Sequence, residues 1–354
     1  MFSRNKFAFP CLLLFLLGGI VVSGQIKRSS LPETIVYERA PDDSAPWPTL
    51  DIYSVNSDGT NVKALTNDGH SHDASWSSDG RQILFIHDGT TQSLPAFRPG
   101  ANVESHFPVG LYAMDRDGSS AHSVLSLGYL LRRAAWSSDS KTIAIALNLP
   151  PTSENRNGPG LFLVAANGQG EPRLLIRGAI APSWSPDGRR LAISRQGAIE
   201  AINADGSGRI SLTDPTVRAE YPAWSPDGKQ IAFDADTGIF HRSEVFVMGA
   251  DGSDPRQITT DPDWGCEYPS WSPNGQTIAF FCRAEVAPCS GIAPGLGTVL
   301  QHAPEALVNP GTTPPPTCVR RIFVIPVNNP PSKLTPLMDH DGAYPAFAPT
   351  VTGN

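Results

Sequence analysis

Histidine and carboxylate side chains concentrate in one short segment, His70-Ser71-His72-Asp73, and His87 follows further along the chain. Imidazole and carboxylate groups at this density are ligands that Zn²⁺ or Mn²⁺ accepts. The spacing matches no firm metal-binding motif, and histidine in polar loops is usually only solvated. We therefore expect no cofactor, and the candidates for a metal alternative are His70, His72, His87 and His340.

Two neighbouring arginines, Arg132 and Arg133, could hold the carboxylates of an anionic glycan. In this hypothesis His72, or a metal bound to it, is the reacting centre of a uronate lyase-like enzyme. The sequence shows no set of nucleophile, base and orienting group, and it has no Gly-x-Ser-x-Gly elbow. A protein without catalytic activity is therefore favoured, and the glycan-active or metal-dependent enzyme is the alternative.

Further side chains that could bind a ligand stand three or four residues before regularly spaced aromatic residues. They are His72, Asp73, Arg132, Arg133, Glu220, Tyr221, Glu267, Tyr268 and Tyr344. If these positions surround one opening, they form a mixed polar and aromatic rim suited to an extended peptide or a sugar chain. Alternatively, the three tyrosines only pack beside the proline that follows each of them.

The element that positions these side chains is a β-hairpin, best seen in residues 221–233. Pro226-Asp227-Gly228 predicts a tight turn, because proline presets φ and glycine accepts a positive φ. Trp224 precedes the turn, and Ile231 and Phe233 alternate with other residues after it, which is typical of buried strand faces.

The hairpin recurs along the chain at a spacing of about 40 to 50 residues, which indicates stacked supersecondary units. The five complete copies have their tryptophan at Trp76, Trp136, Trp184, Trp224 and Trp271. After each hairpin a third strand leads to an Asx-x-Asp-Gly turn and a short fourth strand, as in Asp205-Gly206 and Asp251-Gly252. Four antiparallel strands per repeat predict the blade of a β-propeller.

A sixth copy at residues 344–349 has its first strand but no second one before the chain stops. Residues 34–38, Thr-Ile-Val-Tyr-Glu, have the pattern of that second strand and no hairpin partner of their own. We therefore predict an all-β, six-bladed propeller whose last blade is closed by strands from both termini, so that no sheet array is left open.

These motifs resemble the TolB-like propeller family with its WD40-like PD40 repeats. The resemblance is carried by the order Trp-Ser-Pro-Asp-Gly, Ile-Ala-Phe, Asp-Gly and Leu-Thr over about residues 34–349. It implies the fold, whereas propellers of this kind have many functions. A related propeller type, the oligogalacturonate lyases, uses a histidine-bound metal, which is the model for the enzyme alternative.

The resemblance leaves out two parts of known relatives. Only about ten residues separate residue 24 from the first strand, so the N-terminal α/β domain of the family's namesake has no counterpart in this sequence. Related peptidases add an α/β-hydrolase domain, for which no residues are left.

The strand order predicts two different faces. One carries the uniform Pro-Asp-Gly and Asp-Gly turns, and we name it the turn face. The other, the insertion face, carries the starts of the inner strands and the long connections at residues 88–109, 148–159, 235–242 and 284–319. Loops on a rigid scaffold are where binding usually resides, so we expect binding on the insertion face and at the channel mouth that opens there.

Two further motifs admit more than one interpretation. Asp115-x-Asp117-Gly118 begins like an EF-hand loop, but the third acidic ligand and the final glutamate are missing, so we predict a hairpin turn. Cys266, Cys282, Cys289 and Cys318 are an even set, for which we favour disulfides 266–282 and 289–318 among three connectivities, with free thiols as the alternative.

The N-terminal residues predict export. Arg4 and Lys6 precede an apolar run over residues 7–22 that ends in Ser23 and Gly24, typical of a secretory signal at 1–24, with an uncleaved anchor as the alternative. Residues 25–33 are a short linker, 34–349 the propeller with the Pro-rich insertion 284–319, and 350–354 a tail. The net charge of −7 argues against nucleic acid as a partner.

The leading hypothesis is an exported, monomeric, non-catalytic propeller in the periplasm, at the cell surface or secreted. It binds a protein or peptide of the cell envelope or the extracellular space through its insertion face and channel mouth.

Overall fold

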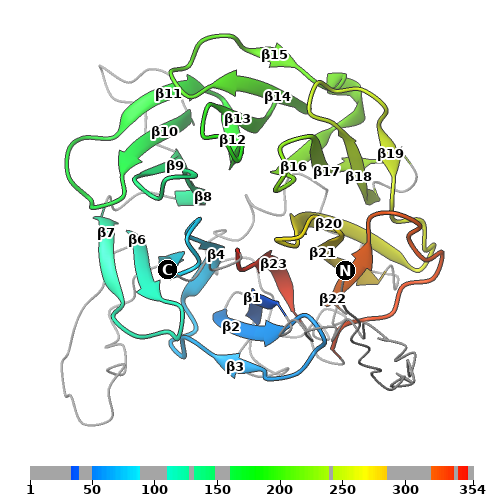
Figure 1. The fold of residues 1–354 in the computed structure, drawn as a ribbon, viewed down its shortest axis with the longest axis horizontal. Helices are drawn as coiled ribbons and strands as arrows, with labels where there is room; N and C mark the ends of the chain where they lie inside the picture. The colour runs from blue at the N-terminus through cyan, green and yellow to red at the C-terminus, as the bar shows by residue number, and fades with distance from the viewer. Residues whose placement is uncertain are drawn as a thin grey trace, which may run out of the picture. The chain divides into compact units, whose positions relative to one another are not determined.

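Six antiparallel β-sheets stand around a central axis (Figure 1). The computed structural model describes residues 33–39, 50–87, 110–126, 131–147, 160–238, 242–284, 320–338 and 342–349, which all lie in the unit Pro32–Asn354. The predicted six-bladed propeller is thereby confirmed. The predicted signal segment, linker and tail, and most of the long insertions, lie outside the described residues.

Each blade places its aromatic strand next to the axis and its later strands progressively outward. The inner strands are β4 (Ser71–Trp76), β8 (Leu131–Trp136), β12 (Ala179–Trp184), β16 (Ala219–Trp224), β20 (Trp264–Trp271) and β23 (Ala343–Phe347). We number the blades 1 to 6 in this order. The second strands are β5 (Gln82–His87), β9 (Thr142–Leu147), β13 (Arg190–Arg195), β17 (Gln230–Asp236), β21 (Thr277–Ala284) and β1 (Thr34–Arg39).

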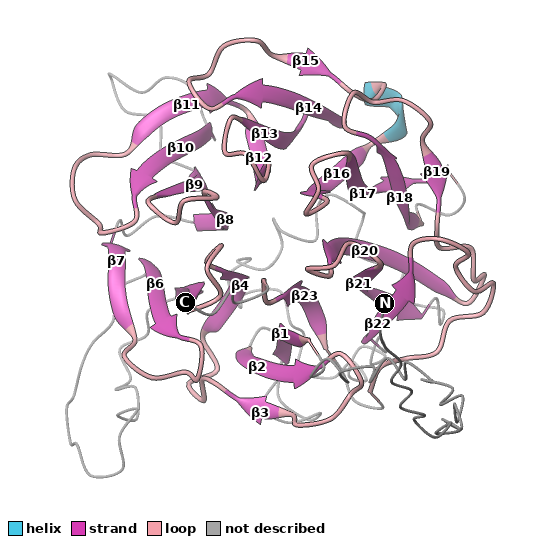
Figure 2. Cartoon of the chain, in the orientation of Figure 1, coloured by secondary structure: helices cyan, strands magenta, loops and turns pink. Residues whose placement is uncertain are grey.

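The outer half of each blade follows the same order. The third strands are β6 (Gly110–Asp115), β10 (Gly160–Ala165), β14 (Ala198–Asn203), β18 (Ser243–Gly249), β22 (Arg320–Pro326) and β2 (Asp51–Asn56). The outermost are β7 (His122–Ser126), β11 (Arg173–Arg177), β15 (Ile210–Ser211), β19 (Arg256–Gln257) and β3 (Lys63–Ala64). Among the described residues the one helical segment is the 3-10 turn η1 (Pro215–Val217) (Figure 2), and none is long and apolar enough to span a membrane.

The repeated hairpin owes its shape to the serine after each tryptophan. In blade 4 the Ser225 hydroxyl donates to Asp227 Oδ1 at 2.7 Å and accepts from the Gln230 backbone N–H at 2.9 Å. Asp227 Oδ1 also accepts from the Lys229 N–H at 3.0 Å, and Gly228 takes a φ of 70°. Because Ser225 is buried, these bonds replace its lost hydration and fix the turn.

Strands from both ends of the described chain complete blade 6, as predicted. In β1, Ile35 pairs with Phe347 and Val36 with Ala346 of β23, and the other edge of β1 pairs with β2. Ile35 is fully buried and Phe347 nearly so. The ring is therefore closed by antiparallel pairing between strands some 300 residues apart, so that β1 has a partner strand on both edges.

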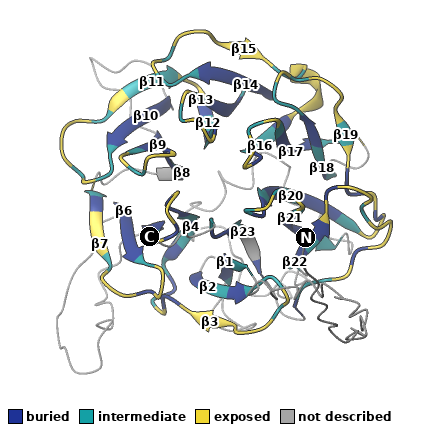
Figure 3. Cartoon of the chain, viewed as in Figure 1, coloured by how far each residue is buried: buried dark blue, intermediate teal, exposed yellow. Residues whose placement is uncertain are grey.

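Most residues of the second and third strands are buried (Figure 3), and apolar side chains of adjacent blades form shared clusters. One cluster, for example, joins Leu84 and Leu111 of blade 1 to Ile143 and Ile145 of blade 2. Each sheet is therefore buried on both faces, which is why the second and third strands read as nearly continuous apolar runs.

Side-chain hydrogen bonds between inner strands alternate around the ring. The residue before the aromatic anchor is serine in blades 1, 3 and 5 and alanine in blades 2, 4 and 6: Ser75, Ala135, Ser183, Ala223, Ser270 and Ala346. Each serine hydroxyl bonds the next blade, through Ala134 O at 3.0 Å, Trp224 N at 3.1 Å and Phe347 N at 3.1 Å.

The tryptophans of the serine blades bond in the opposite direction. The indole N–H groups of Trp76, Trp184 and Trp271 donate to the carbonyls of Ala346, Ala135 and Ala223 in the preceding blades, at 3.0 to 3.2 Å. All six interfaces thus carry one such bond. The indole N–H groups of Trp136 and Trp224 have no partner among the described residues.

Blade 5 has three strands among the described residues, because the segment after β22 lacks backbone donors at Pro330, Pro331 and Pro336. Instead, the Leu334 N–H donates to Asp261 Oδ2 at 2.8 Å and the Leu337 N–H to Ile322 O at 2.7 Å.

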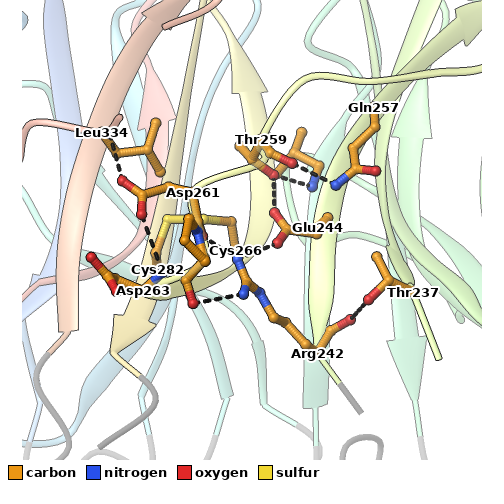
Figure 4. A network of polar contacts seen from close by, with 12 residues as sticks. Thr237, Arg242, Glu244, Gln257, Thr259, Asp261, Asp263, Cys266, Cys282 and Leu334 are labelled. Atoms are coloured by element: carbon orange, nitrogen blue, oxygen red, sulfur yellow. Dashed lines mark hydrogen bonds and ion pairs between the residues drawn. A yellow bond between two sulfur atoms is a disulfide. The ribbon is translucent and has the colours of Figure 1, made fainter. Parts of the chain in front are cut away.

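Asp261 belongs to a polar network at the junction of blades 4 and 5 (Figure 4). Arg242 bonds the backbone carbonyls of Asp261 and Pro262, and its Nη2 lies 2.6 Å from Glu244 Oε1. Thr259 donates to the same carboxyl of Glu244. The network ties the segment that links the two blades to blade 4.

The disulfide Cys266–Cys282 joins β20 and β21 and is fully buried. Pairing extended back from Trp271 and Ile278 places Glu267 opposite Cys282, but in the structure Cys266 is directly opposite. The register differs because a β-bulge between Glu267 and Ser270 inserts one extra residue into the inner strand. The predicted 289–318 bridge lies outside the described residues.

Replacing Cys266 and Cys282 together by alanine should lower the free energy of unfolding by about 3 kcal/mol, the loop-closure value for a bridge of this span. Urea titration under oxidising conditions measures the change. Both proteins are titrated without a reducing agent, so that any bridge between Cys289 and Cys318 stays intact in each. A variant within about 0.5 kcal/mol of the parent would contradict this prediction.

Candidate functional site

The inner strands share a backbone irregularity three residues before their tryptophan. Non-glycine residues take a left-handed φ at this position in blades 1 to 5: Asp73 at 55°, Arg133 at 32°, Ala181 at 49°, Tyr221 at 50° and Tyr268 at 59°. Each coincides with a register shift against the second strand. Such φ values are costly for non-glycine residues and persist only where surrounding contacts enforce them.

Side chains from preceding blades provide that enforcement in blades 1, 4 and 5. The Asp73 N–H donates to the Glu38 carboxyl, the Tyr221 N–H to Ser194 Oγ at 3.0 Å, and the Tyr268 N–H to Asp234 Oδ1 at 3.1 Å. Glu38, Ser194 and Asp234 all come from second strands and are buried.

The bulges bring three predicted rim residues into direct contact across the channel. The guanidinium carbon of Arg133 in blade 2 lies 4.3 Å from the ring centroid of Tyr268 in blade 5 and 5.1 Å from that of Tyr221 in blade 4. The two tyrosine ring centroids are 3.8 Å apart. We name Arg133, Tyr221 and Tyr268 the mouth cluster.

Carboxyl groups surround the mouth cluster. Arg133 Nε lies 3.9 Å from Asp73 Oδ1, and Asp73 Oδ2 lies 3.4 Å from His72 Nδ1. Burial acts to raise the pKa of Asp73, but its hydrogen bond with His72 and the charges of His72 and Arg133 outweigh burial and lower the pKa.

Two buried carboxyls at the mouth have the opposite shift. Burial, reinforced by the charge of Asp73, raises the pKa of Glu38 to about 8. Burial and the charge of Glu267 raise the pKa of Asp234 well above its ordinary value. Glu38 is therefore largely uncharged at neutral pH, so the anionic charge beside Arg133 is concentrated on Asp73.

The fold and the inner-strand motif agree with one known family. The family model of the TolB beta propeller domain, PD40, matches residues 99–290. The chain belongs to this family. No curated protein matches it.

Solved structures of similar fold include two TolB proteins. The putative TolB of Agrobacterium tumefaciens superposes with a TM-score of 0.59 at 19% identity, covering 88% of this chain and 91% of that one. TolB of Acinetobacter baumannii gives a TM-score of 0.60 at 16% identity, covering 90% and 67%. Hydrazine synthase of Kuenenia stuttgartiensis gives 0.60 at 11% identity, covering 90% and 47%. At these identities the likeness concerns the fold.

The other predicted rim residues of this TolB-type propeller lie at the corresponding positions of the inner strands. Glu220 pairs with Asp234 across β16 and β17, and Glu267 forms an ion pair with Arg283 at 2.8 Å. Arg132 and Tyr344 lie at the expected strand positions, but their side chains are outside the description. Tyr268 is 6% exposed and also contacts Phe281, whereas Tyr221 is partly exposed.

The predicted metal candidates separate into different surroundings. His72 is with Asp73, whereas His87 is buried with its Nε2 3.7 Å from Asp68 Oδ2 and its ring 6.2 Å from that of His70. His340 lies outside the described residues. Within the described ranges, no three His, Cys, Asp or Glu side chains are placed to hold a metal ion together.

Sequence reasoning missed Glu38 and Asp234, on which the bulges depend. A signal was present, because both are acidic residues inside otherwise apolar strands, Ile-Val-Tyr-Glu and Ile-Ala-Phe-Asp. A buried carboxylate in such a strand needs a partner, and the N–H of the neighbouring bulge is that partner.

Replacing Glu38 by glutamine should change the pH dependence of stability. The pKa of Glu38 is 4.5 in its ordinary state and about 8 when folded, so between these values the folded protein holds a proton that the unfolded chain has lost. This group therefore reduces stability as pH rises from about 5 to 8, by roughly 1.4 kcal/mol per unit, and adds no slope above its folded pKa.

Urea unfolding of the parent and the Glu38→Gln variant across this pH range measures the effect. The variant should gain stability relative to the parent as pH rises. The same amide substitution at exposed Glu171 controls for the loss of a surface carboxylate. Parallel pH profiles of parent and Glu38→Gln protein would show that Glu38 does not titrate in this range.

Proposed function

We propose that this propeller is a non-catalytic binding module that holds an extended peptide segment of a protein partner at its channel mouth, on the insertion face. The observation that carries the proposal is the mouth cluster, because three blades contribute charged and aromatic groups to one point on the axis. Aromatic residues are among the side chains most enriched where proteins bind one another strongly.

The rigidity of the mouth supports the same role. The left-handed residues Asp73, Tyr221 and Tyr268 are fixed by hydrogen bonds from neighbouring blades, so their side chains are held before any partner arrives. Preorganised groups lose little conformational entropy on binding, which favours affinity for a flexible peptide. The turn face offers no comparable variety, since its turns repeat nearly the same polar residues in each blade.

Export to the periplasm or beyond the cell belongs to this proposal. The disulfide Cys266–Cys282 supports it, since such bridges persist in oxidising compartments and are rare in the cytosol. The charged and apolar pattern of residues 1–24 supports it independently. The partner on this view is a protein of the cell envelope or of the extracellular space.

Site-specific photo-crosslinking tests the proposal. A photoreactive amino acid at position 220, beside the mouth cluster, should capture a partner from envelope extract, and the same group at exposed position 229 on the turn face should not. Tyr221→Ala in the first protein should reduce capture about tenfold or more, as expected for loss of an aromatic anchor.

Equal capture from both positions, or capture unchanged by Tyr221→Ala, would place the binding surface elsewhere. Circular dichroism and thermal unfolding of each variant establish that the propeller is intact, so that lost capture reflects the surface.

A further inference from the structure

The side chain of Arg133 occupies a slot built by other blades. Its strand, β8, belongs to blade 2, whereas the aromatic rings beneath its guanidinium belong to β16 and β20 in blades 4 and 5. The carboxylate of Asp73, with Oδ1 3.9 Å from the Arg133 Nε, belongs to blade 1. We name the site formed by Tyr221, Tyr268 and Asp73 the slot. The Arg133 side chain occupies it in the way that a bound ligand would, although both belong to one chain.

The slot has the two features by which proteins recognise a guanidinium. The Tyr268 ring lies 4.3 Å below the guanidinium carbon, and the Tyr221 ring lies beside it, so the cation stands over aromatic faces. A carboxylate lies beside it, with Asp73 Oδ1 of β4 3.9 Å from the Arg133 Nε. The charge of Arg133 acts on Asp73 and Asp234.

A planar guanidinium suits this geometry better than an ammonium. It stacks flat on an aromatic ring, is weakly hydrated and presents donors at its edge to carboxylates, whereas lysine is a compact, strongly hydrated charge. The slot is also rigid, because its floor is held by the Tyr268 N–H bond to Asp234 and by the contact of Tyr268 with Phe281.

We propose that this slot is a recognition site for an arginine side chain of the partner peptide, and that Arg133 is a built-in competitor that the incoming arginine displaces. The inference rests on the proposed peptide binding at the mouth and adds to it the residue type that the mouth selects. The Arg133 side chain is 32% exposed, so it borders solvent and can leave the slot without unfolding of its strand.

The competition has a measurable consequence. A side chain tethered next to its site is present at a high effective concentration, so it weakens any external ligand for the same site. Removing it should therefore strengthen the binding of an arginine peptide, whereas removal of a simple contact residue would weaken binding.

The test uses three fluorescent Gly/Ser peptides that differ only in their central residue, which is arginine, citrulline or lysine. Citrulline has the shape of arginine without its charge. With Arg133→Ala, affinity for the arginine peptide should rise about tenfold over the parent, as expected for release of a desolvated cation–π contact. The citrulline peptide should gain nothing, and the lysine peptide less than the arginine peptide.

Arg209→Ala is the matched control, because Arg209 is an arginine of blade 3 that pairs with Glu200 away from the mouth, and this variant should bind like the parent. Adding Tyr268→Leu to Arg133→Ala should remove the preference for arginine over citrulline. Millimolar methylguanidinium should raise the Tm of the Arg133→Ala protein and leave the parent and the double variant unchanged. This thermal shift needs no peptide and so reports on the slot alone.

Equal affinity of Arg133→Ala for arginine and citrulline peptides would overturn the inference, as would weaker binding of the arginine peptide than in the parent. Either result leaves peptide binding at the mouth standing if capture from position 220 still depends on Tyr221. Loss of that dependence, with methylguanidinium still raising the Tm of Arg133→Ala, would instead remove the proposed function and retain the slot.

Discussion

One extra residue in the inner strand of a blade is the constraint on which the candidate site depends. The bulge puts Asp73, Arg133, Tyr221 and Tyr268 into a left-handed conformation, which a regular strand would not adopt. The Tyr221 and Tyr268 rings contact each other at a tilt, and Arg133 reaches both from the other side of the channel. The same shift in blade 5 sets Cys266 opposite Cys282. The strained backbone of the inner strands therefore sets the positions of the side chains at the channel mouth.

In blades 1 and 5 the bulged N–H is held by a buried carboxyl of the preceding blade, and in blade 4 by the hydroxyl of Ser194. Glu38 stands in the strand that closes the ring and accepts the N–H of Asp73 in blade 1. Closure of blade 6 and the conformation of the mouth therefore share one residue. Its raised pKa is the electrostatic cost of that position, because an uncharged carboxyl is tolerated in the interior where a charged one is not.

The fold could be predicted because its signal is repeated. Trp-Ser-x-Asp-Gly carries its own turn chemistry, with Ser225 and Asp227 bonded to each other, so each copy is readable without its neighbours. The pairing of residues 34–38 with residues 344–349 could also be predicted, because each segment lacked the strand that the other supplies. The rim positions were predictable from spacing, but their contacts were not, since a left-handed Arg133 or Tyr268 has no signature in a single sequence. The role of Glu38 could not be predicted, because it contacts Asp73 of blade 1, and blades 6 and 1 become neighbours only when the ring closes.

The alternation of Ser75, Ala135, Ser183, Ala223, Ser270 and Ala346 bears on how many blades this sequence can assemble. Serine blades supply both kinds of bond, the hydroxyl forward and the indole backward, and alanine blades receive them. Strict alternation of serine and alanine blades around a closed ring is possible only when the number of blades is even. A ring of five or seven blades would place two serine blades or two alanine blades next to each other. That interface would have two of these bonds or none, instead of one. The alternation therefore disfavours rings with an odd number of blades.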